Sequence, residues 1–467
     1  PLVVMPQNTF YRTYGTDTIE EIGNAVIQTA DGGFLIAGGE VVPAPIQWWK
    51  GNGVLLRTDP NGEVLWRTAI IAPGTHGIEF RDLIINAAGQ YVVTGVYSHE
   101  WNASPLNDDV FLALYDEAGE EVWSTRIGGP YRDLGNAVRQ LPDGGYAVGG
   151  SRWTAPLPGA IGTACLARFS STGDSLWFRT YPGPIGEGQY GFCMDVSGDS
   201  GYFLGGHRDY FTQTRVLIMH VDSQGDTIWT RRLDTLDEGT AIDVLATSDG
   251  GVLATGYSTA TGFSRPFLAK LDASGEVIWS NTYPEVYPGW AYSICETATG
   301  YTLAGLTGQY HYMMHGVDFN GELLWSHIIE PEGNYGYGYD IAHTTDGGFV
   351  VTGVEVTNTS LDIVLIKTDS VGQITTSVQA QPIAAPLGLR AFPNPTERYL
   401  TVEYAMKHAD PVVVRILDAS GREMQSYQPP GAGSGSLSID LDGLAMGPFL
   451  IEARSERETW VLRAIKL

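Results

Sequence analysis

The segment DPNGEVLW at residues 59–66 decides the fold, because close copies of it recur along the chain. Each copy places a tryptophan four residues after a glycine, at Trp66, Trp123, Trp177, Trp229, Trp279 and Trp325. Successive tryptophans are 57, 54, 52, 50 and 46 residues apart. Self-similar text with a period of about 50 residues is typical of a repeat architecture.

Each repeat contains signals for four short strands. A polar turn, DGG at residues 31–33, precedes one apolar run, and a second apolar run precedes the tryptophan segment. The turn recurs at 143–145, 249–251 and 346–348, with weaker copies at 88–90, 199–201 and 299–300, which makes seven units. In the first unit we expect strands A to D at 24–29, 34–38, 54–58 and 64–68. Four-stranded units repeated radially predict an all-β fold, a seven-bladed β-propeller.

The two ends of the repeat region predict how the ring closes. In the seventh unit, Thr376 stands where the other units have tryptophan. The N-terminal text FYRTY at 10–14 matches WFRTY at 177–181, so Phe10 takes the tryptophan position. We therefore expect the N-terminal strand to complete the seventh blade, and the six repeated tryptophans to pack between neighbouring blades.

The sequence pattern changes after the repeats, and the new pattern predicts a second domain. Residues 1–376 are the expected propeller, and the uncharged, Ala- and Pro-rich segment 377–389 is the expected linker. Short apolar strands then recur between residues 390 and 467, at 400–404, 412–417, 436–439, 449–453 and 460–465. This pattern favours a small Ig-like β-sandwich.

The motifs of this second domain resemble a known family. FPNP at 392–395, LTV at 400–402, DASGR at 418–422 and a final strand ending at Leu467 occur in that order. The segment resembles the type A C-terminal sorting domain of the type IX secretion system of Bacteroidetes, although Phe449 stands where that family usually has tyrosine. The resemblance implies recognition by the translocon and its shuttle barrel, and export to the outer-membrane surface or the extracellular space. It also implies removal of the domain by a sortase, with attachment of the remainder to surface lipopolysaccharide.

The repeats themselves resemble those of secreted propellers that commonly precede such sorting domains. That family is defined by its fold and has no agreed activity, so the resemblance leaves the function of the propeller open.

Aromatic residues gather at one predicted end of the propeller. In an up-and-down blade the A–B and C–D turns share one end, here called the turn face, and the B–C and D–A loops share the other, here called the loop face. The turns are short and alike, whereas loops such as 40–53, 97–109 and 151–162 are long and differ between units. Exposed aromatic side chains on variable loops are typical of a binding surface, although long loops also bury their own aromatics. The predicted ligand-binding residues are Trp48, Trp49, Trp101, Trp153, Tyr210, Trp290, Tyr310 and Tyr312.

The net charge of the chain restricts the classes of partner that it can bind. The chain has a formal net charge of −26, nearly all of it on the propeller. Such a surface repels nucleic acid and anionic membranes and suits a neutral glycan, a cationic partner or loosely held divalent cations. No apolar stretch is long enough to cross a membrane as a helix.

No pattern typical of catalysis is present, and we predict no catalytic residue, metal site or cofactor. His311 and His315 are four apart on a predicted strand, not a helix, and the three cysteines lack paired spacing. Asp82, Asp243 and Asp340 share one position of strand A. Such carboxylates either do acid–base chemistry or accept hydrogen bonds from the backbone of the next blade.

Five Asp-Ser/Thr-aliphatic triplets resemble the O-glycosylation motif of Bacteroidetes. The resemblance implies a glycoprotein, with these acceptor residues: Thr18, Ser175, Thr227, Thr235 and Ser370.

The sequence thus favours a secreted cell-surface propeller that binds a glycan or protein through its loop face. One alternative is a carbohydrate-active enzyme with carboxylates on the same face. The other is a structural component of a cell-surface assembly.

Overall fold

The computed structural model describes most of the propeller and most of the second domain. The described ranges are 8–15, 19–41, 51–73, 76–99, 107–155, 161–210, 213–259, 262–283, 288–374, 389–392, 398–405, 411–418, 422–429, 434–444, 447–455, 457 and 459–466. The chain divides into two compact units, residues 1–375 and 376–467, and each is described by itself. The predicted linker, 377–389, lies almost entirely outside the described residues.

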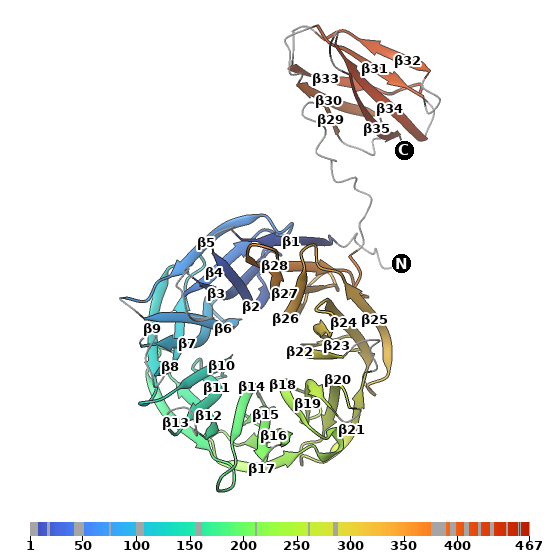
Figure 1. The fold of residues 1–467 in the computed structure, drawn as a ribbon. Helices are drawn as coiled ribbons and strands as arrows, with labels where there is room; N and C mark the ends of the chain where they lie inside the picture. The colour runs from blue at the N-terminus through green and yellow to red at the C-terminus, as the bar shows by residue number, and fades with distance from the viewer. Residues whose placement is uncertain are drawn as a thin grey trace. The chain divides into compact units, whose positions relative to one another are not determined.

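The first unit is a ring of seven four-stranded antiparallel groups, counted over its described residues (Figure 1). The first strand of each blade lies toward the centre of the ring. These inner strands are β2 (Glu20–Gln28), β6 (Gly77–Ile85), β10 (Asp133–Gln140), β14 (Gln189–Val196), β18 (Gly239–Ala246), β22 (Gly289–Thr297) and β26 (Tyr335–His343). The second strands are β3 (Phe34–Val41), β7 (Tyr91–Ser98), β11 (Tyr146–Trp153), β15 (Tyr202–Tyr210), β19 (Val252–Ser258), β23 (Gly300–Thr307) and β27 (Phe349–Val356).

The third and outermost strands complete each blade. The third strands are β4 (Asn52–Thr58), β8 (Asp108–Tyr115), β12 (Gly162–Phe169), β16 (Gln213–Val221), β20 (Arg265–Leu271), β24 (Tyr312–Asp318) and β28 (Leu361–Thr368). The outermost strands are β5 (Val64–Ile70), β9 (Glu121–Ile127), β13 (Ser175–Tyr181), β17 (Thr227–Arg232), β21 (Val277–Thr282), β25 (Leu323–Ile329) and, in the seventh blade, β1 (Phe10–Tyr14). A short 3-10 helix, η1 (Asp234–Leu236), follows β17. The seven-bladed propeller predicted from the repeats is confirmed.

The core lies between the blades. The middle strands read as continuous apolar runs because both of their faces are covered by neighbouring blades, and every residue of β7 is buried. Between the first and last blades, Val26 and Ile36 pack with Val350 and Leu365. This contact joins the two ends of the repeat region into the ring.

The repeated tryptophans dock each blade on the next. Gly119, at a φ of 80°, closes the C–D turn of the second blade, and a Cβ atom there would lie 2.8 Å from the Trp66 ring of the first blade. Phe10 takes the same place in the seventh blade: it pairs with Lys367 of β28 and lies against Gly62 of the first blade. The predicted role of Phe10 is confirmed. The other docking pairs are Trp123 with Gly173, Trp177 with Gly225, Trp229 with Gly275, Trp279 with Gly321 and Trp325 with Gly372.

The second unit is a small β-sandwich of two sheets. One sheet has the order β29 (Leu389–Phe392), β30 (Tyr399–Ala405) and β33 (Ser434–Asp440). The other has the order β32 (Glu423–Tyr427), β31 (Val413–Leu417), β34 (Gly447–Arg454) and β35 (Thr459–Lys466). Leu400, Val402, Ile416 and Ile451 form part of a separate core, so this unit buries its own apolar surface.

Candidate functional site

The loop face holds the predicted ligand-binding residues that the structure describes. Trp153 ends β11 and Trp290 is the second residue of β22, so both lie at the loop-face ends of strands, and both are half-buried. The Arg132 guanidinium lies 5.3 Å from the Trp153 ring centre, within cation–π range. Four further predictions for this face are not tested: Trp48, Trp49 and Trp101 lie outside the described residues, and only the backbone of Tyr210 is described.

One predicted site residue is not on the surface. Tyr312 is the first residue of β24, and only 1% of its side chain is exposed. Its hydroxyl lies 3.2 Å from both the Val354 carbonyl oxygen and Glu355 Oε2. The expectation that Tyr312 binds a ligand is therefore corrected: strand alternation turns it into the blade, where it helps to hold the seventh blade.

Tyr310 is held in an unusual conformation and is exposed. Its φ is 63°, in the left-handed region that bulky residues rarely adopt, and 38% of it is exposed. A tight turn fixes it: the Tyr310 amide donates to the Thr307 carbonyl at 2.8 Å, and the Gly336 amide donates to the Tyr310 carbonyl at 2.6 Å. A strained backbone that presents an aromatic ring is a pointer to function.

A line of tyrosines connects Tyr310 to the middle of the ring. Its ring lies 5.2 Å from Tyr335, which is 46% exposed, and 5.6 Å from Tyr337. Tyr337 lies 6.1 Å from Tyr339, and Tyr339 lies 5.3 Å from Tyr292. These distances are typical of aromatic contacts. The line thus runs from the exposed loop face to residues that border the central channel.

Seven β-bulges shape the central channel. The inner strand of every blade skips one residue in its pairing, at the same repeat position. A bulge re-aims the side chain of the extra residue. The seven extra residues, here called the bulge residues, all line one cavity of about 300 Å³, the central channel. They are Asn24, Arg81, Asn136, Phe192, Ile242, Tyr292 and Tyr339. The repeat pattern does not single out this set, because no one amino-acid type is shared by all seven positions: asparagine and tyrosine each occur twice. The residue that precedes the bulge is glycine in four blades and alanine in two, but it is Phe80 in the second blade, so it gives only a weak sequence signal.

In the second, fifth and seventh blades, the residue after the bulge is an aspartate that ties neighbouring blades together. Asp243 accepts the Val244 amide at 2.8 Å and the Ile294 amide of the next blade at 2.9 Å. Asp340 accepts the Ser293 hydroxyl at 2.7 Å and the Val26 amide of the first blade at 2.8 Å. Asp82 likewise accepts the Val138 amide at 2.7 Å. Of the two readings of these aspartates, the structure supports bonds to the backbone of the next blade.

Burial gives two of these carboxyl groups unusually high pKa values. Burial raises the pKa of Asp243 to about 7 and the pKa of Asp340 to about 6, although the Arg139 guanidinium opposes the shift at Asp243. Arg139 itself is held between Asp82 and Asp195, at 2.9 Å from an oxygen of each. The channel wall therefore carries opposite charges that largely neutralise one another.

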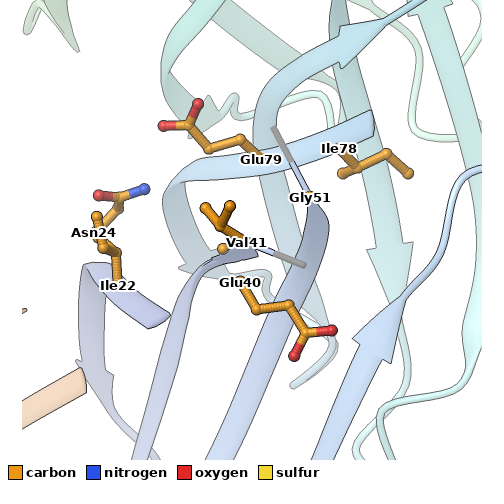
Figure 2. A pocket seen from close by; sticks show the side chains of 8 residues that line it. Ile22, Asn24, Glu40, Val41, Gly51, Ile78 and Glu79 are labelled. Carbon is orange, nitrogen blue, oxygen red and sulfur yellow. The ribbon is translucent and has the colours of Figure 1, made fainter. Parts of the chain in front are cut away.

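A second, much smaller pocket lies between the first two blades (Figure 2). It encloses about 20 Å³, room for about one water molecule, and its lining includes Glu40 and Glu79. Figure 2 shows these two carboxylates pointing in different directions. Glu40 is instead paired with Arg67, which also contacts the buried Glu21. This pocket does not bring two carboxylates onto a common point.

The remaining candidate residues have simple placements. Ser175, Thr227, Thr235 and Ser370 are exposed, as a glycosylation acceptor has to be, and Thr18 lies outside the described residues. His315 is buried in β24 and His311 precedes that strand. Over the ranges described, no group of three metal-ligating side chains converges.

Comparison with known proteins identifies the second unit. Residues 390–466 match a family model described as a secretion system C-terminal sorting domain. This segment is a secretion sorting domain. The sorting domain directs export to the cell surface or the extracellular space, and handling by the type IX secretion system follows from it. No helix within the described residues is long and apolar enough to cross a membrane.

Several solved structures are similar to the chain at low sequence identity, with TM-scores below 0.5. Raptor from Chaetomium thermophilum is 11% identical with a TM-score of 0.47; the match covers 77% of this chain and 30% of Raptor, so this chain corresponds to less than a third of that protein. The Dos1 propeller is 11% identical with a TM-score of 0.44, over 98% of this chain and 95% of that one. The Pan2 WD40 domain from Neurospora crassa is 9% identical with a TM-score of 0.45, over 78% and 98%. A search of curated proteins finds no match.

Proposed function

We propose that this exported propeller binds a neutral glycan through the aromatic side chains of its loop face. The observation that carries the proposal is Tyr310: a strained turn presents its ring to solvent, at the start of a line of tyrosines that leads to the central channel. Stacking on a sugar ring uses a flat apolar face with a polar edge, which tyrosine and tryptophan provide.

Charge supports a neutral ligand. The net charge of −26 disfavours an acidic polysaccharide, a nucleic acid or an anionic membrane. Trp153, with Arg132 against its ring, offers a second aromatic contact on the same face. Hydrolysis of the bound glycan has less support, because the oxygens of Asp82, Asp243 and Asp340 already accept backbone amides.

A glycan array probed with the whole chain and with Tyr310→Gly tests the proposal. Glycine adopts a positive φ without strain, so the substitution removes the ring while relieving the backbone. We expect glycan affinity to fall by about 1–3 kcal/mol, as for an aromatic anchor, while the free energy of unfolding changes by no more than about 1 kcal/mol.

Ser200→Gly is the matched control. Ser200 also has a positive φ, 68°, but lies in an A–B turn on the turn face. This control relieves the same type of strain and should leave glycan binding unchanged. If no neutral glycan binds, or if both variants bind like the wild-type chain, the proposal is wrong. A cell-surface protein captured by the wild-type chain but not by Tyr310→Gly would instead point to a protein ligand.

A further inference from the structure

The seven bulge residues fall into two unlike groups around the central channel, although Asp243 and Asp340 of the fifth and seventh blades also line it. Blades one to three contribute the polar side chains Asn24, Arg81 and Asn136. Blades four to seven contribute Phe192, Ile242, Tyr292 and Tyr339. Because the blades follow one another around the ring, the polar residues are adjacent and the apolar residues are adjacent. A channel that served only to close the propeller would have no reason to be sorted in this way.

The polar half retains hydrogen-bonding capacity. Asn24 Nδ2 donates to the Phe80 carbonyl at 2.7 Å, Arg81 Nη1 to Asn136 Oδ1 at 2.8 Å, and Asn136 Nδ2 to the Gly191 carbonyl at 2.9 Å. These bonds join blades one to four and fix the side chains in place. An amide has two N–H groups and one carbonyl, and a guanidinium has five N–H groups, so donors and acceptors remain for a ligand.

The apolar half offers exposed aromatic surface. Phe192 is 38% exposed and its ring lies 5.2 Å from His207, which holds it against the fourth blade. Tyr292 and Tyr339 contact one another edge to face and are half-buried. Tyr339 also ends the line of tyrosines that begins at the exposed Tyr310 and Tyr335. The apolar wall of the channel is therefore continuous with the loop face.

We infer that the central channel binds one terminal ring of a neutral glycan, with its C–H face on Phe192, Tyr292 and Tyr339 and its hydroxyls toward Asn24, Arg81 and Asn136. A sugar ring has one apolar face and a polar edge, which matches a cavity with one apolar and one polar wall. The cavity of about 300 Å³ is at the lower end for small-molecule sites, which suits one end of a chain and not its middle.

The inference rests on the proposed glycan binding and makes it more specific: the propeller recognises chain ends. The two arginines that line the cavity, Arg81 and Arg139, face three lining aspartates, Asp82, Asp243 and Asp340. This near balance of charge provides no site for a strongly charged sugar.

Saturation-transfer-difference NMR on the whole chain tests the inference with small probes. The probes are the methyl glycosides of glucose, galactose, mannose, xylose and N-acetylglucosamine, which present a single ring. We expect at least one to receive saturation from the wild-type chain. Ile242→Trp places an indole at a channel-lining bulge position and should abolish that signal. Ile278→Trp is the matched control, because Ile278 is 55% exposed on the outer strand β21.

A second variant guards against misfolding of the first. Tyr339→Leu keeps an apolar side chain but removes the stacking surface, and should weaken binding of the same methyl glycoside about tenfold or more. If no methyl glycoside binds, or if both channel variants bind it like Ile278→Trp, the channel inference is wrong. Glycan-array binding that survives in Ile242→Trp would show that the loop face works without the channel. If the wild-type chain binds no glycan on the array, the proposed function itself is wrong.

Discussion

Individual residues at the loop face and in the channel differ in how far they contribute to packing and how far they are presented to solvent. Tyr310 is held in a backbone conformation that opposes stability, and its ring is exposed, so the turn serves presentation more than packing. Asp243 and Asp340 are the reverse case: both line the channel, but their oxygens accept amides from the next blade. At this scale, a position that looks functional in the repeat turns out to hold the ring together.

The raised pKa values of these two aspartates predict how stability depends on pH. Burial raises the pKa of Asp243 to about 7 and that of Asp340 to about 6, above the value of an unfolded chain. At pH values between the unfolded pKa of about 4 and these folded pKa values, the folded state therefore binds more protons than the unfolded state. The contribution of these two groups to stability is greatest below the unfolded pKa of about 4 and is lost as pH rises through the folded values. We expect the free energy of unfolding in urea to fall by roughly 1–3 kcal/mol between pH 5.5 and pH 8.

Comparing Asp243→Asn with Asp272→Asn separates the pH dependence caused by Asp243 from that caused by the other titratable groups of the chain. The asparagine at 243 cannot titrate, so the fall in stability with pH should become smaller. Asp272 is exposed, and the Ser274 hydroxyl lowers its pKa, so it stays ionised over the same range. The slope of stability against pH should therefore be unchanged in Asp272→Asn. An unchanged slope in both variants would show that Asp243 is not the source.

At the scale of strands and blades, two repeated devices build the ring. One is the docking of each tryptophan, or Phe10, on a glycine turn of the next blade. The tryptophan and glycine recur in the text, so the sequence predicts this device well. The other is the bulge in each inner strand. The first inner strand also begins earlier than expected, because β2 starts at Glu20 and pairs with β3 on both sides of its bulge, whereas the sequence predicted a start at Asn24. A bulge depends on strand pairing and leaves no fixed residue type, so single-sequence reasoning missed it and the channel residues with it.

Adding a methyl group at a docking glycine should disrupt blade packing. In Gly119→Ala the new Cβ atom would lie 2.8 Å from the Trp66 ring, so the indole has to move. Gly144→Ala is the matched control, because Gly144 has a similar φ of 84° and its nearest neighbour lies 3.8 Å away. Both variants strain the backbone. We expect Gly119→Ala to be less stable than Gly144→Ala by roughly 1–3 kcal/mol, as in overpacked cores. Equal losses in urea denaturation would mean that the tryptophan contact contributes little.

At the scale of the whole molecule, the chain combines a β-propeller with a secretion sorting domain. The propeller and the sorting domain bury separate cores, so each can fold without the other. The repeat text and the family resemblance predicted both folds. They did not predict which loop-face aromatics are exposed: Tyr310 and Tyr312 are two residues apart, yet only the first reaches solvent. That difference arises where a turn becomes a strand, and it is not visible in composition.

Deleting residues 390–466 should separate folding from export. We expect the truncated protein to retain its thermal unfolding transition, because the propeller core remains complete, and to be absent from the cell surface and the medium. Fractionation of cells that export the intact chain, followed by immunoblotting, measures this outcome. Normal surface levels of the truncated protein would show that the sorting domain is not what directs export.

We propose that a neutral glycan binds the loop face and enters the channel. Hydrogen exchange of the whole chain, with and without a neutral glycan selected on the array, tests it most directly because it locates the ligand on the backbone. We predict slower exchange in the Tyr310 turn, residues 307–311, and along β26, with no change at the A–B turns 29–33 and 141–145 of the turn face. Protection confined to the turn face, or to the sorting domain, would contradict the account.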